Sequence, residues 1–382
     1  MPDRSKGESA LLTALLLCLY KRESALTRTE RPVTQPGGRP RRSNATLEEV
    51  AHVAGVSRAT VSRVVNGSPK VSPDVRVDVQ AAIERLGYVP NRAARSLVTR
   101  RSDSIAVIIT EPSGRLFSDP FFPRLLRGIS SELAARNRQL ILLMPGSAAD
   151  ESRTADYLTA GHVDGVLLVS LHGDDPLPAR LTTAGMPIVV AGRPPKGAKA
   201  SYVDVDNRQG AQSAVGHLIA GRRRAIATIS GPLDMAPGVD RRHGYRDALA
   251  EAGITGDPTL ETIGDFTQES GVLAMKRLLA ARPDLDAVFA ASDLMAAGAL
   301  SVLAAAGRRV PADVAVVGFD DSPVATSTTP QLTSVRQPIE EMGHEMARLL
   351  IDAVEASDPV PRRVILATEL IRRASSAGRP SP

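Results

Sequence analysis

Between residues 46 and 66, apolar positions recur at helical spacing in two short segments that are separated by a glycine. Four apolar residues of the first segment fall on one helix face: Leu47, Val50, Ala51 and Ala54. Thr46 precedes this segment and Glu49 stands three residues later, which is the spacing of a capping box at a helix start. The pattern therefore predicts a short amphipathic helix that begins beside Thr46.

A second helix is predicted after Gly55, because glycine adopts the backbone of a sharp turn readily. Ser57 is placed to cap this helix, and three valines form its apolar face: Val61, Val64 and Val65. The opposite face carries donors and small side chains that suit the edges of bases in a major groove. With the capping residues, these are the candidate DNA-binding residues of the segment: Thr46, Ser57, Arg58, Ala59, Thr60, Ser62, Arg63 and Asn66.

A third helix is predicted after Ser72, with Pro73 at its first position and Gly87 at its end. Its apolar stripe would close a three-helix core: Val75, Val79, Ile83 and Leu86. Three short helices with a polar outer face indicate a helix-turn-helix DNA-binding unit. The alternative is a helical hairpin that only packs, since such patterns also occur without DNA binding.

From residue 105 the pattern changes to short apolar runs separated by amphipathic segments of helix length. Seven runs rich in β-branched residues are predicted as buried strands: 105–109, 140–144, 165–169, 187–191, 225–230, 287–291 and 314–319. This alternation predicts α/β architecture with parallel sheets that helices cover on both faces. Such folds bind ligands in a cleft at the carboxyl ends of the strands, so a small-molecule site is expected there.

Charge is distributed unevenly along the 382 residues. The formal net charge of +5 divides into +5 for residues 1–45, +4 for residues 46–101 and −4 for the remainder. A basic end that contains the predicted helix-turn-helix supports contact with nucleic acid. Charge runs are usually only solvated surface, so this distribution supports the interpretation without proving it.

The remaining composition argues against several classes of protein. The single cysteine, Cys18, excludes an internal disulfide and fits a reducing compartment, so we expect a cytoplasmic protein. The six histidines show no metal-ligand spacing, and neither a metal nor another cofactor is expected. The sequence contains no nucleophile elbow, phosphate loop or zinc motif, which argues against an enzyme.

The first 44 residues are interpreted as a flexible extension. Residues 10–20 form an apolar run that is too short to cross a bilayer and lacks the cleavage site of a secretory signal. This run is either a loosely ordered amphipathic tail or the product of an upstream start codon that the cell does not use. Residues 35–44, QPGGRPRRSN, have the composition of a linker.

Two segments carry a close resemblance to a known family. TLEEVAHVAGVSRATVSRVVN and VSPDVRVDVQAAIERLGYVPNRAARSL resemble the headpiece and hinge of the lactose-repressor family of bacterial transcription regulators. The resemblance continues to about residue 371. It implies that Asn91 caps a short hinge helix, that Ala94 allows close approach of a partner helix, and that Leu97 wedges between base pairs in the minor groove.

The resemblance also implies a two-lobed domain like periplasmic sugar-binding proteins, with three chain crossings between the lobes and an effector site in the cleft. Eight residues are predicted to line this cleft, four because they match family motifs and four because they stand at the ends of predicted strands: Phe121, Phe122, Arg241 and Phe266, and then Arg193, Ser292, Asp293 and Asp320. Arg241, in RRHGY, would fork onto ligand oxygens, and Phe266, in GDFTQES, would stack on a ring. Phe121 and Phe122 fit a core position equally well.

Some positions depart from the family pattern. Ser292 stands where several sugar-responsive members have asparagine, and Gly192 stands where many have aspartate. Residues 113–118 lengthen a loop near the expected site. Asp206 and Asn207 are interpreted as helix-capping residues rather than ligand contacts.

The family assembles as homodimers on palindromic operator DNA, and the same partners are expected here. Segments 122–136 and 294–306 match the family's dimer surface, and the tail lacks the apolar heptads that would form a tetramer. The predicted domains are a flexible extension (1–44), a helix-turn-helix domain (45–90), a hinge helix and linker (91–101), a two-lobed effector-binding and dimerisation domain (102–373) and a disordered tail (374–382).

We therefore expect a transcriptional regulator, by family precedent a repressor, whose operator affinity a sugar or sugar derivative controls allosterically. Two alternatives belong to other classes. A solute-binding protein of the periplasmic type would share residues 105–371 but have no DNA role. An enzyme would require a catalytic motif of the kinds that the sequence lacks.

Overall fold

The computed structural model describes residues 45–65, 67–89, 101–146, 148–195 and 198–377. The chain divides into two compact units, Met1–Pro90 and Asn91–Pro382. Four of the predicted DNA-binding residues lie outside the described residues: Asn66, Asn91, Ala94 and Leu97. None of the helices in the described ranges is both long enough and apolar enough to cross a membrane.

The described part of the first unit contains the three predicted helices: α2 (Leu47–Ala54), α3 (Arg58–Val65) and α4 (Pro73–Leu86). The predicted capping box is confirmed, since Thr46 N donates to Glu49 Oε2 at 2.7 Å and Glu49 N donates to Thr46 Oγ1 at 3.2 Å. Gly55 ends α2 with a left-handed φ of 64°. Ser57 Oγ accepts a hydrogen bond from Thr60 N at 3.1 Å, which confirms it as the cap of α3.

The three helices enclose a small apolar core at whose centre three side chains are fully buried: Val50, Val61 and Val79. The predicted stripe of α4 contributes to this core, with Val75, Ile83 and Leu86 packed against it. The start of α4 differs from prediction in one respect, because the Ser72 side chain makes no capping hydrogen bond. Gly87 ends the helix with a φ of 60°, as predicted.

The second unit is built on two six-stranded sheets. Sheet A has the order β11 (Arg363–Leu366), β5 (Ser201–Val205), β4 (Ile188–Ala191), β3 (Gly165–Val169), β1 (Ser104–Ile109) and β2 (Gln139–Leu143). Sheet B has the order β12 (Glu369–Ile371), β10 (Thr333–Arg336), β9 (Ala315–Asp320), β8 (Ala287–Ala290), β6 (Ile226–Ser230) and β7 (Glu261–Ile263). Neighbouring strands are parallel except for β10 and β12, which are antiparallel.

All seven predicted strands are present, and the sheets are parallel as predicted. Five further strands were not predicted: β5, β7, β10, β11 and β12. Each of them has five residues or fewer and mixes polar with apolar side chains. Such a stretch lacks the continuous apolar run by which a buried parallel strand is recognised in sequence.

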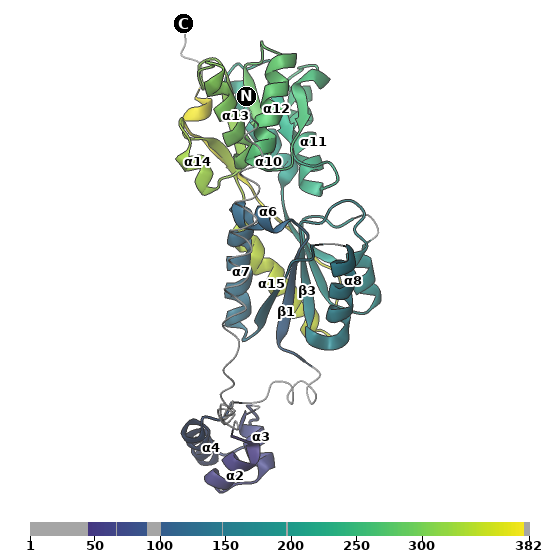
Figure 1. Ribbon diagram of the computed structural model, residues 1–382, viewed down its shortest axis with the longest axis vertical. Helices are drawn as coiled ribbons and strands as arrows, with labels where there is room; N and C mark the ends of the chain where they lie inside the picture. The colour runs from purple at the N-terminus through teal and green to yellow at the C-terminus, as the bar shows by residue number, and fades with distance from the viewer. Residues whose placement is uncertain (1–44, 66, 90–100, 147, 196–197, 378–382) are drawn as a thin grey trace, which may run out of the picture. The chain divides into compact units, whose positions relative to one another are not determined.

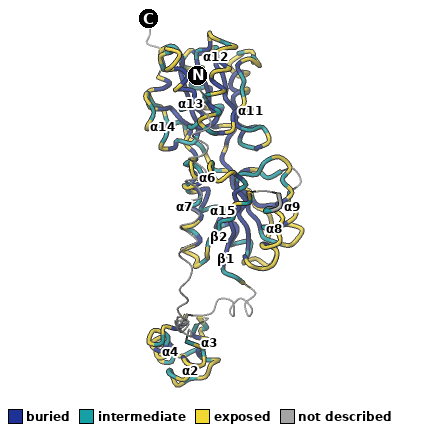
Figure 2. Tube along the Cα trace, in the orientation of Figure 1, coloured by how far each residue is buried: buried dark blue, intermediate teal, exposed yellow. Residues whose placement is uncertain are grey.

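Helices cover both faces of each sheet, so that each lobe has three layers (Figure 1). In the lobe of sheet A, α7 (Phe121–Ala135) and α15 (Ile339–Glu355) cover one face, and α8 (Ala148–Tyr157), the π-helical turn η1 (Leu158–His162) and α9 (Leu177–Thr183) cover the other. In the lobe of sheet B, α10 (Asn207–Ala220) and α11 (Ala236–Glu251) lie opposite α12 (Gln268–Ala281) and α13 (Asp293–Ala305). The central strands are the buried layer, as Figure 2 shows.

The chain crosses between the lobes three times, as the resemblance implied. The crossings follow β5, β10 and β11 and lie at 205–207, 336–339 and 366–369. The first and third are neighbours in space, since Asp206 N donates to Leu366 O at 2.9 Å and Thr368 Oγ1 donates to Asp206 O at 3.4 Å. Two lobes whose backbones are connected by such short segments can rotate relative to one another about them.

Two segments differ from their predicted structure. Residues 113–118, predicted as a lengthened loop, form helix α6 (Ser113–Ser118). Residues 374–376, assigned to a disordered tail, form the 3-10 helix η3 (Ala374–Ser376), in which Ser375 and Ser376 are buried. Ser375 Oγ donates to Val316 O at 2.6 Å, so these residues complete the lobe of sheet B. Hydrogen-bonded serines give no hydrophobic pattern, which is why the sequence analysis ended the domain too early. Two short elements complete the described fold: η2 (Pro258–Leu260) and α14 (Pro323–Ser327).

Helices α7 and α15 approach each other closely at two glycines. A Cβ atom on Gly128 would lie 2.0 Å from Glu340 O, and one on Gly343 would lie 2.4 Å from Leu125 O. Gly128→Ala is therefore expected to force the helices apart and to lower the free energy of unfolding by about 2–3 kcal/mol, as overpacking of a core does. Urea denaturation of the full chain measures the change.

Gly216→Ala is the matched control, because Gly216 lies inside α10 with open space around its Cα. Alanine has the higher helix propensity, so this control is expected to leave stability unchanged or to raise it slightly. An unchanged urea midpoint for Gly128→Ala would contradict the close packing of α7 on α15.

Candidate functional site

The outer face of α3 in the first unit carries the predicted DNA-binding residues. Ser57, Arg58, Ala59 and Arg63 are exposed, whereas Thr60 and Ser62 are partly buried. The apolar face of the same helix is held in the core by Val61 and Val64. Core packing therefore fixes which residues of α3 face outward, as a recognition helix requires.

Two of the predicted DNA-binding residues also have roles within the unit. Thr46 caps α2, and Arg58 Nε forms an ion pair with Glu48 Oε1 at 2.9 Å. Both side chains of this pair are more than half exposed, at 68% and 63%. An exposed pair contributes at most about 1 kcal/mol, so Arg58 can exchange Glu48 for a phosphate or a base.

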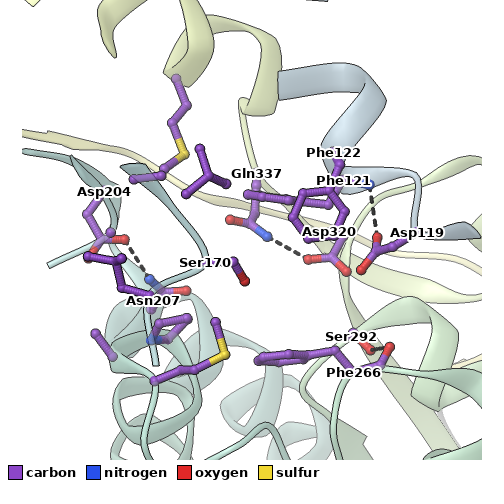
Figure 3. Close-up of a pocket in the computed structure, with 18 of the residues that line it drawn as sticks. Asp119, Phe121, Phe122, Ser170, Asp204, Asn207, Phe266, Ser292, Asp320 and Gln337 are labelled. Carbon is purple, nitrogen blue, oxygen red and sulfur yellow. Dashed lines mark hydrogen bonds between the residues drawn. The ribbon is translucent and has the colours of Figure 1, made fainter. Parts of the chain in front are cut away.

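A pocket of about 790 Å³ lies in the second unit where strand ends of the two lobes meet. The lobe of sheet A contributes residues at or after the ends of β1, β3, β4 and β5, and the lobe of sheet B contributes residues at or after the ends of β6, β7, β8 and β9. In Figure 3, Asp204 and Asn207 lie on one side of this space and Asp119 and Asp320 on the other.

Arg241 of α11 is the central cation of the pocket wall. Its Nη1 donates to Ala291 O and its Nε donates to Asn207 Oδ1 at 2.8 Å. The guanidinium lies 3.7 Å from the centre of the Phe319 ring and 3.7 Å from Asp320 Oδ1. Burial lowers the pKa of Arg241, although four carboxylates, led by Asp320, act in the opposite direction. These contacts hold the Arg241 side chain in a fixed orientation in the pocket wall.

Three carboxyl groups line the pocket in poorly solvated positions. Burial raises the pKa of Asp204 to about 6, although the backbone N–H groups of Val205 and Arg193 donate to it. Burial likewise raises the pKa of Asp119 and, strongly, that of Asp320. Gln337 Nε2 donates to Asp320 Oδ1 at 2.5 Å. Carboxylates held in this way are suited to accept hydrogen bonds from ligand hydroxyl groups.

Four residues that line the pocket have a left-handed backbone: Ser170, Gly192, Phe266 and Asp320. Their φ angles are 64°, 83°, 70° and 113° in that order. Residues other than glycine adopt a positive φ at an energetic cost. Residues strained in this way are concentrated at functional sites. Glycine adopts a positive φ without this cost, so the backbone conformation at residue 192 favours the glycine that this chain has there.

Aromatic side chains form the apolar part of the wall. Phe122 is fully buried and Phe121 is partly buried, and their rings meet edge to face with centroids 5.4 Å apart. Phe266 comes from the other lobe and lies across the pocket floor in Figure 3. Aromatic faces beside carboxylates and amides are the combination that proteins use for sugars, whose rings have apolar faces and hydroxylated edges.

Comparison with known proteins accounts for both units. Residues 46–91 match the profile of bacterial regulatory proteins of the lacI family, and residues 215–376 match that of the periplasmic binding protein-like domain. The HTH-type transcriptional regulator CelR of Thermobifida fusca is 53% identical over 338 residues, which are 88% of this chain and 99% of CelR. The chain belongs to the lacI family of bacterial regulatory proteins.

Other relatives extend this assignment. The ribose operon repressor of Escherichia coli (strain K12) is 33% identical over 336 residues, which are 87% of this chain and all of the repressor. A structure of a complex of the transcriptional regulator CelR with cellobiose is 51% identical and covers 87% of this chain and all of that one, with a TM-score of 0.70. The lac repressor dimer bound to operator and the anti-inducer ONPF is 27% identical, with coverages of 87% and 99% and a TM-score of 0.77. The predicted family and fold class are confirmed.

Seven of the eight predicted effector residues of this lacI-family member line the pocket: Phe121, Phe122, Arg193, Arg241, Phe266, Ser292 and Asp320. Ser292 also caps α13 and donates to Phe266 O at 3.3 Å. Asp293 does not line the pocket, which corrects the sequence analysis. Its buried carboxylate accepts from Ser322 N at 2.7 Å and from Ser334 Oγ at 2.5 Å.

Asn207 was interpreted as a helix-capping residue, but it lines the pocket. Asp206 caps α10 as predicted, by accepting from Gln209 N at 3.0 Å. Asn207 instead lies in the pocket wall, where it accepts from Arg241 and donates to Asp204 Oδ1 at 2.9 Å. Six further lining residues with polar side chains were not predicted as site residues: Arg115, Asp119, Ser170, Asp204, Asn207 and Gln337. Ser170 directly follows a predicted strand, so the strand-end rule could have identified it.

A hydrogen-bond network around His172 connects the lobes beside the pocket. His172 Nε2 lies 3.1 Å from Glu111 Oε1 in its own lobe, and its Nδ1 lies 2.9 Å from Asp234 Oδ2 in the other lobe. Gly173 N donates to Asp234 O at 2.9 Å in the same place. Arg115 and Ser170 also donate to Glu111 Oε1, at 2.7 Å and 2.5 Å. Because carboxylates only accept, both contacts of His172 are satisfied only when the imidazole is protonated.

The pKa of His172 is raised, first by its hydrogen bond to Glu111 and also by Asp234. A raised pKa means that the stabilisation is fully present below the ordinary value of about 6.5 and is lost as the pH rises through the raised value. His172→Gln is therefore expected to lower the melting temperature more at pH 6 than at pH 8.5. The difference corresponds to less than about 1 kcal/mol, since the side chain is 36% exposed.

Differential scanning calorimetry of the full chain at both pH values measures this effect. His243→Gln is the control, because His243 is an exposed histidine of α11 outside the pocket wall. An equal loss of stability at pH 6 and pH 8.5 for His172→Gln would show that the protonated form is not what joins the lobes.

Proposed function

We propose that this chain is a sequence-specific transcriptional regulator, acting as a repressor, whose affinity for operator DNA is controlled by a sugar. The observation that carries the proposal is that one chain combines an outward-facing recognition helix with a pocket of carboxylates, amides and aromatic rings. Relatives that match it over nearly their whole length are named as a transcriptional regulator and an operon repressor, which supports the proposal. A regulator of transcription acts where the nucleoid is, so the proposal includes a cytoplasmic location and no enzymatic role.

The proposed effector is cellobiose or a closely similar neutral sugar. A relative with 51% identity has been solved as a complex with cellobiose. The wall of the pocket in this chain contains as many aspartates as arginines, three of each, which suits a neutral ligand better than an anion. Seven predicted residues stay assigned to effector contact: Phe121, Phe122, Arg193, Arg241, Phe266, Ser292 and Asp320. Asp204, Asn207 and Gln337 join them because their polar atoms line the same space.

The proposed DNA contacts come from the recognition helix and the hinge. Thr46, at the start of α2, stays assigned to DNA contact. The major groove is assigned to residues of the recognition helix and its flanks: Ser57, Arg58, Ala59, Thr60, Ser62, Arg63 and Asn66. The hinge at the minor groove is assigned Asn91, Ala94 and Leu97. Two such headpieces bind a palindromic operator when the chain is a homodimer, as in the lac repressor dimer bound to operator. The proposed dimer surface includes α7 and α13, and the domain bounds follow the sequence analysis except that the effector domain extends to Ser376.

The proposed mechanism is a change of lobe arrangement that is transmitted to the hinge. Sugar binding between the lobes favours one rotation about the three crossings, and that rotation sets the separation of the two hinges in the dimer. Thermodynamic linkage then requires effector and operator to change each other's affinity by the same factor, commonly worth about 1–3 kcal/mol.

Two linked measurements test this function. Selection from a pool of random duplexes by the full chain is expected to enrich a palindromic sequence. Fluorescence anisotropy with that duplex is then expected to show that cellobiose changes the dissociation constant, while sucrose does not. Failure to enrich any sequence, together with sugar binding, would favour a solute-binding protein without a DNA role. Enrichment with no response to cellobiose would remove that sugar as the effector.

A further inference from the structure

Helix α6 and the residue after it place two polar side chains in the pocket wall. Both side chains keep hydrogen-bonding capacity beyond their contacts within the protein. Arg115 lies within the helix, and Asp119 follows its last residue. Leu116 anchors the helix in the core of its lobe with 2% of its surface exposed. Because Leu116 points inward, the position of its neighbour Arg115 at the pocket is fixed by packing rather than by a mobile loop.

The guanidinium of Arg115 is only partly paired. Its Nη1 donates to Glu111 Oε1 at 2.7 Å, and Glu111 is buried. Its Nε is buried and has no hydrogen-bond partner within the described ranges. A buried N–H group without an acceptor is unfavourable, so native proteins rarely retain one without a ligand or ordered water beside it. Nε and Nη2, the outer edge of the guanidinium, are parallel donors of the kind that binds two neighbouring oxygen atoms.

Asp119 presents the complementary acceptor. One of its oxygens, Oδ1, accepts from Phe121 N at 2.9 Å, as the dashed line in Figure 3 shows. Burial raises the pKa of this carboxyl group, although Arg115 and Arg241 favour its ionised form. A carboxylate with remaining acceptor capacity in a poorly solvated site is stabilised by a hydroxyl group that replaces the lost water.

Helix α6 also connects the two lobes across the pocket. The guanidinium carbon of Arg115 lies 5.4 Å from the centre of the Phe266 ring, and Phe266 belongs to the other lobe. Arg241 lies 5.7 Å from the same ring. A ligand that contacts Arg115 therefore also lies beside the aromatic side chain proposed to stack on the sugar. If Arg115 served only to brace Glu111, Nη1 alone would be sufficient.

We infer that α6 is a specificity-determining element of the effector site, in which the outer edge of Arg115 donates to, and Asp119 accepts from, neighbouring oxygen atoms of a neutral sugar. This inference rests on the proposed function, because it concerns the same pocket. It gives a role to residues 113–118, which the sequence analysis described only as lengthening a loop near the expected site. A sugar that lacks oxygens at this wall should bind less tightly than one that has them.

Two substitutions test the pair while preserving its surroundings. Asp119→Asn keeps the shape of the side chain but removes the charge. Arg115→Lys keeps a cation beside Glu111 but removes the planar pair of donors. Titration calorimetry of the full chain with cellobiose is expected to show at least about tenfold weaker binding for each variant, the loss that accompanies one charged hydrogen bond. Glucose, measured in parallel, is expected to be affected less, so the preference for cellobiose should fall.

Ser118→Ala is the control, because Ser118 is an exposed residue of the same helix that does not line the pocket. Melting temperatures close to that of the unmodified chain confirm that the variants are folded. Unchanged cellobiose affinity in either Asp119→Asn or Arg115→Lys would overturn the inference while the proposed function stands. If the unmodified chain binds neither cellobiose nor glucose, the proposed effector fails, and the assignment of α6 fails with it.

Discussion

Replacing Arg241 with alanine is expected to abolish the response to the effector while DNA binding is retained. The substitution removes donors to Ala291 O and Asn207 Oδ1 and leaves Asp320 without its nearest cation. Truncating one member of a buried charge pair commonly costs about 2–5 kcal/mol, so effector affinity should fall at least about thirtyfold. The helix-turn-helix lies in the other unit and does not depend on this contact.

Two measurements on the same preparation separate the effects of Arg241→Ala. Titration calorimetry with cellobiose reports effector binding, and anisotropy with operator DNA in the absence of sugar reports DNA binding. Arg246→Ala is the matched control, since Arg246 belongs to the same helix but pairs with Glu261 outside the pocket wall. A normal response to cellobiose in Arg241→Ala would remove Arg241 from the site.

Replacing Arg63 with alanine is expected to weaken specific operator binding at least about thirtyfold, with a much smaller effect on random DNA. Arg63 is exposed on α3, and buried valines on the opposite side of that helix fix its outward direction. One contact between an arginine and a guanine edge is worth about 1–3 kcal/mol, and a dimer makes two of them. The total loss is about 2–6 kcal/mol, and its lower limit corresponds to the thirtyfold weaker operator binding.

Binding curves on operator and random duplexes, each at several salt concentrations, distinguish base contact from phosphate contact for Arg63. If Arg63 contacts only phosphate, affinity falls equally on both duplexes and the salt dependence becomes shallower. Arg85→Ala is the control for lost charge, because Arg85 is exposed on α4 and not on the recognition helix. Its effect should be small and the same for both duplexes.

The sequence was a good guide wherever a local pattern determines local structure. The capping box at Thr46, the turn at Gly55 and the cap at Ser57 each involve residues within four positions of one another. The central strands are continuous apolar runs because helices cover them on both faces. Short edge strands such as β7 and β11 gave no such signal, since their partly exposed faces accept polar residues.

The pocket was predictable where a motif marks a position or where a residue stands at the end of a predicted strand. Arg241 lies in a helix motif and Phe266 in a loop motif, and both reach the site. Gln337 and Asn207 reach it because they lie on the crossing segments, and only the assembled lobes bring those segments together. The sequence alone therefore did not predict that Gln337 and Asn207 lie close together.

Asp293 shows the limit of the strand-end rule in the other direction. It follows β8 closely, yet α13 begins at this residue and directs its carboxylate toward Ser322 and Ser334. The rule identifies the end of the sheet at which side chains gather, but the next helix decides whether a given side chain faces the pocket or the core. Ser292, one residue earlier, faces the pocket.

Because the chain crosses between the lobes three times, the lobe of sheet A can be completed only after residues near the end of the chain have been synthesised. Sheet A begins at β1 but receives its last strand, β11, only at residues 363–366, and α15 must also arrive before α7 is covered. A ribosome that stops near residue 338 would release a product whose β5 edge is unpaired and whose α7 lacks its packing partner. Exposed strand edges and apolar helix faces promote aggregation, so a nonsense mutation even in the final eighth of the gene should yield protein that is degraded rather than a shortened, constitutively active regulator.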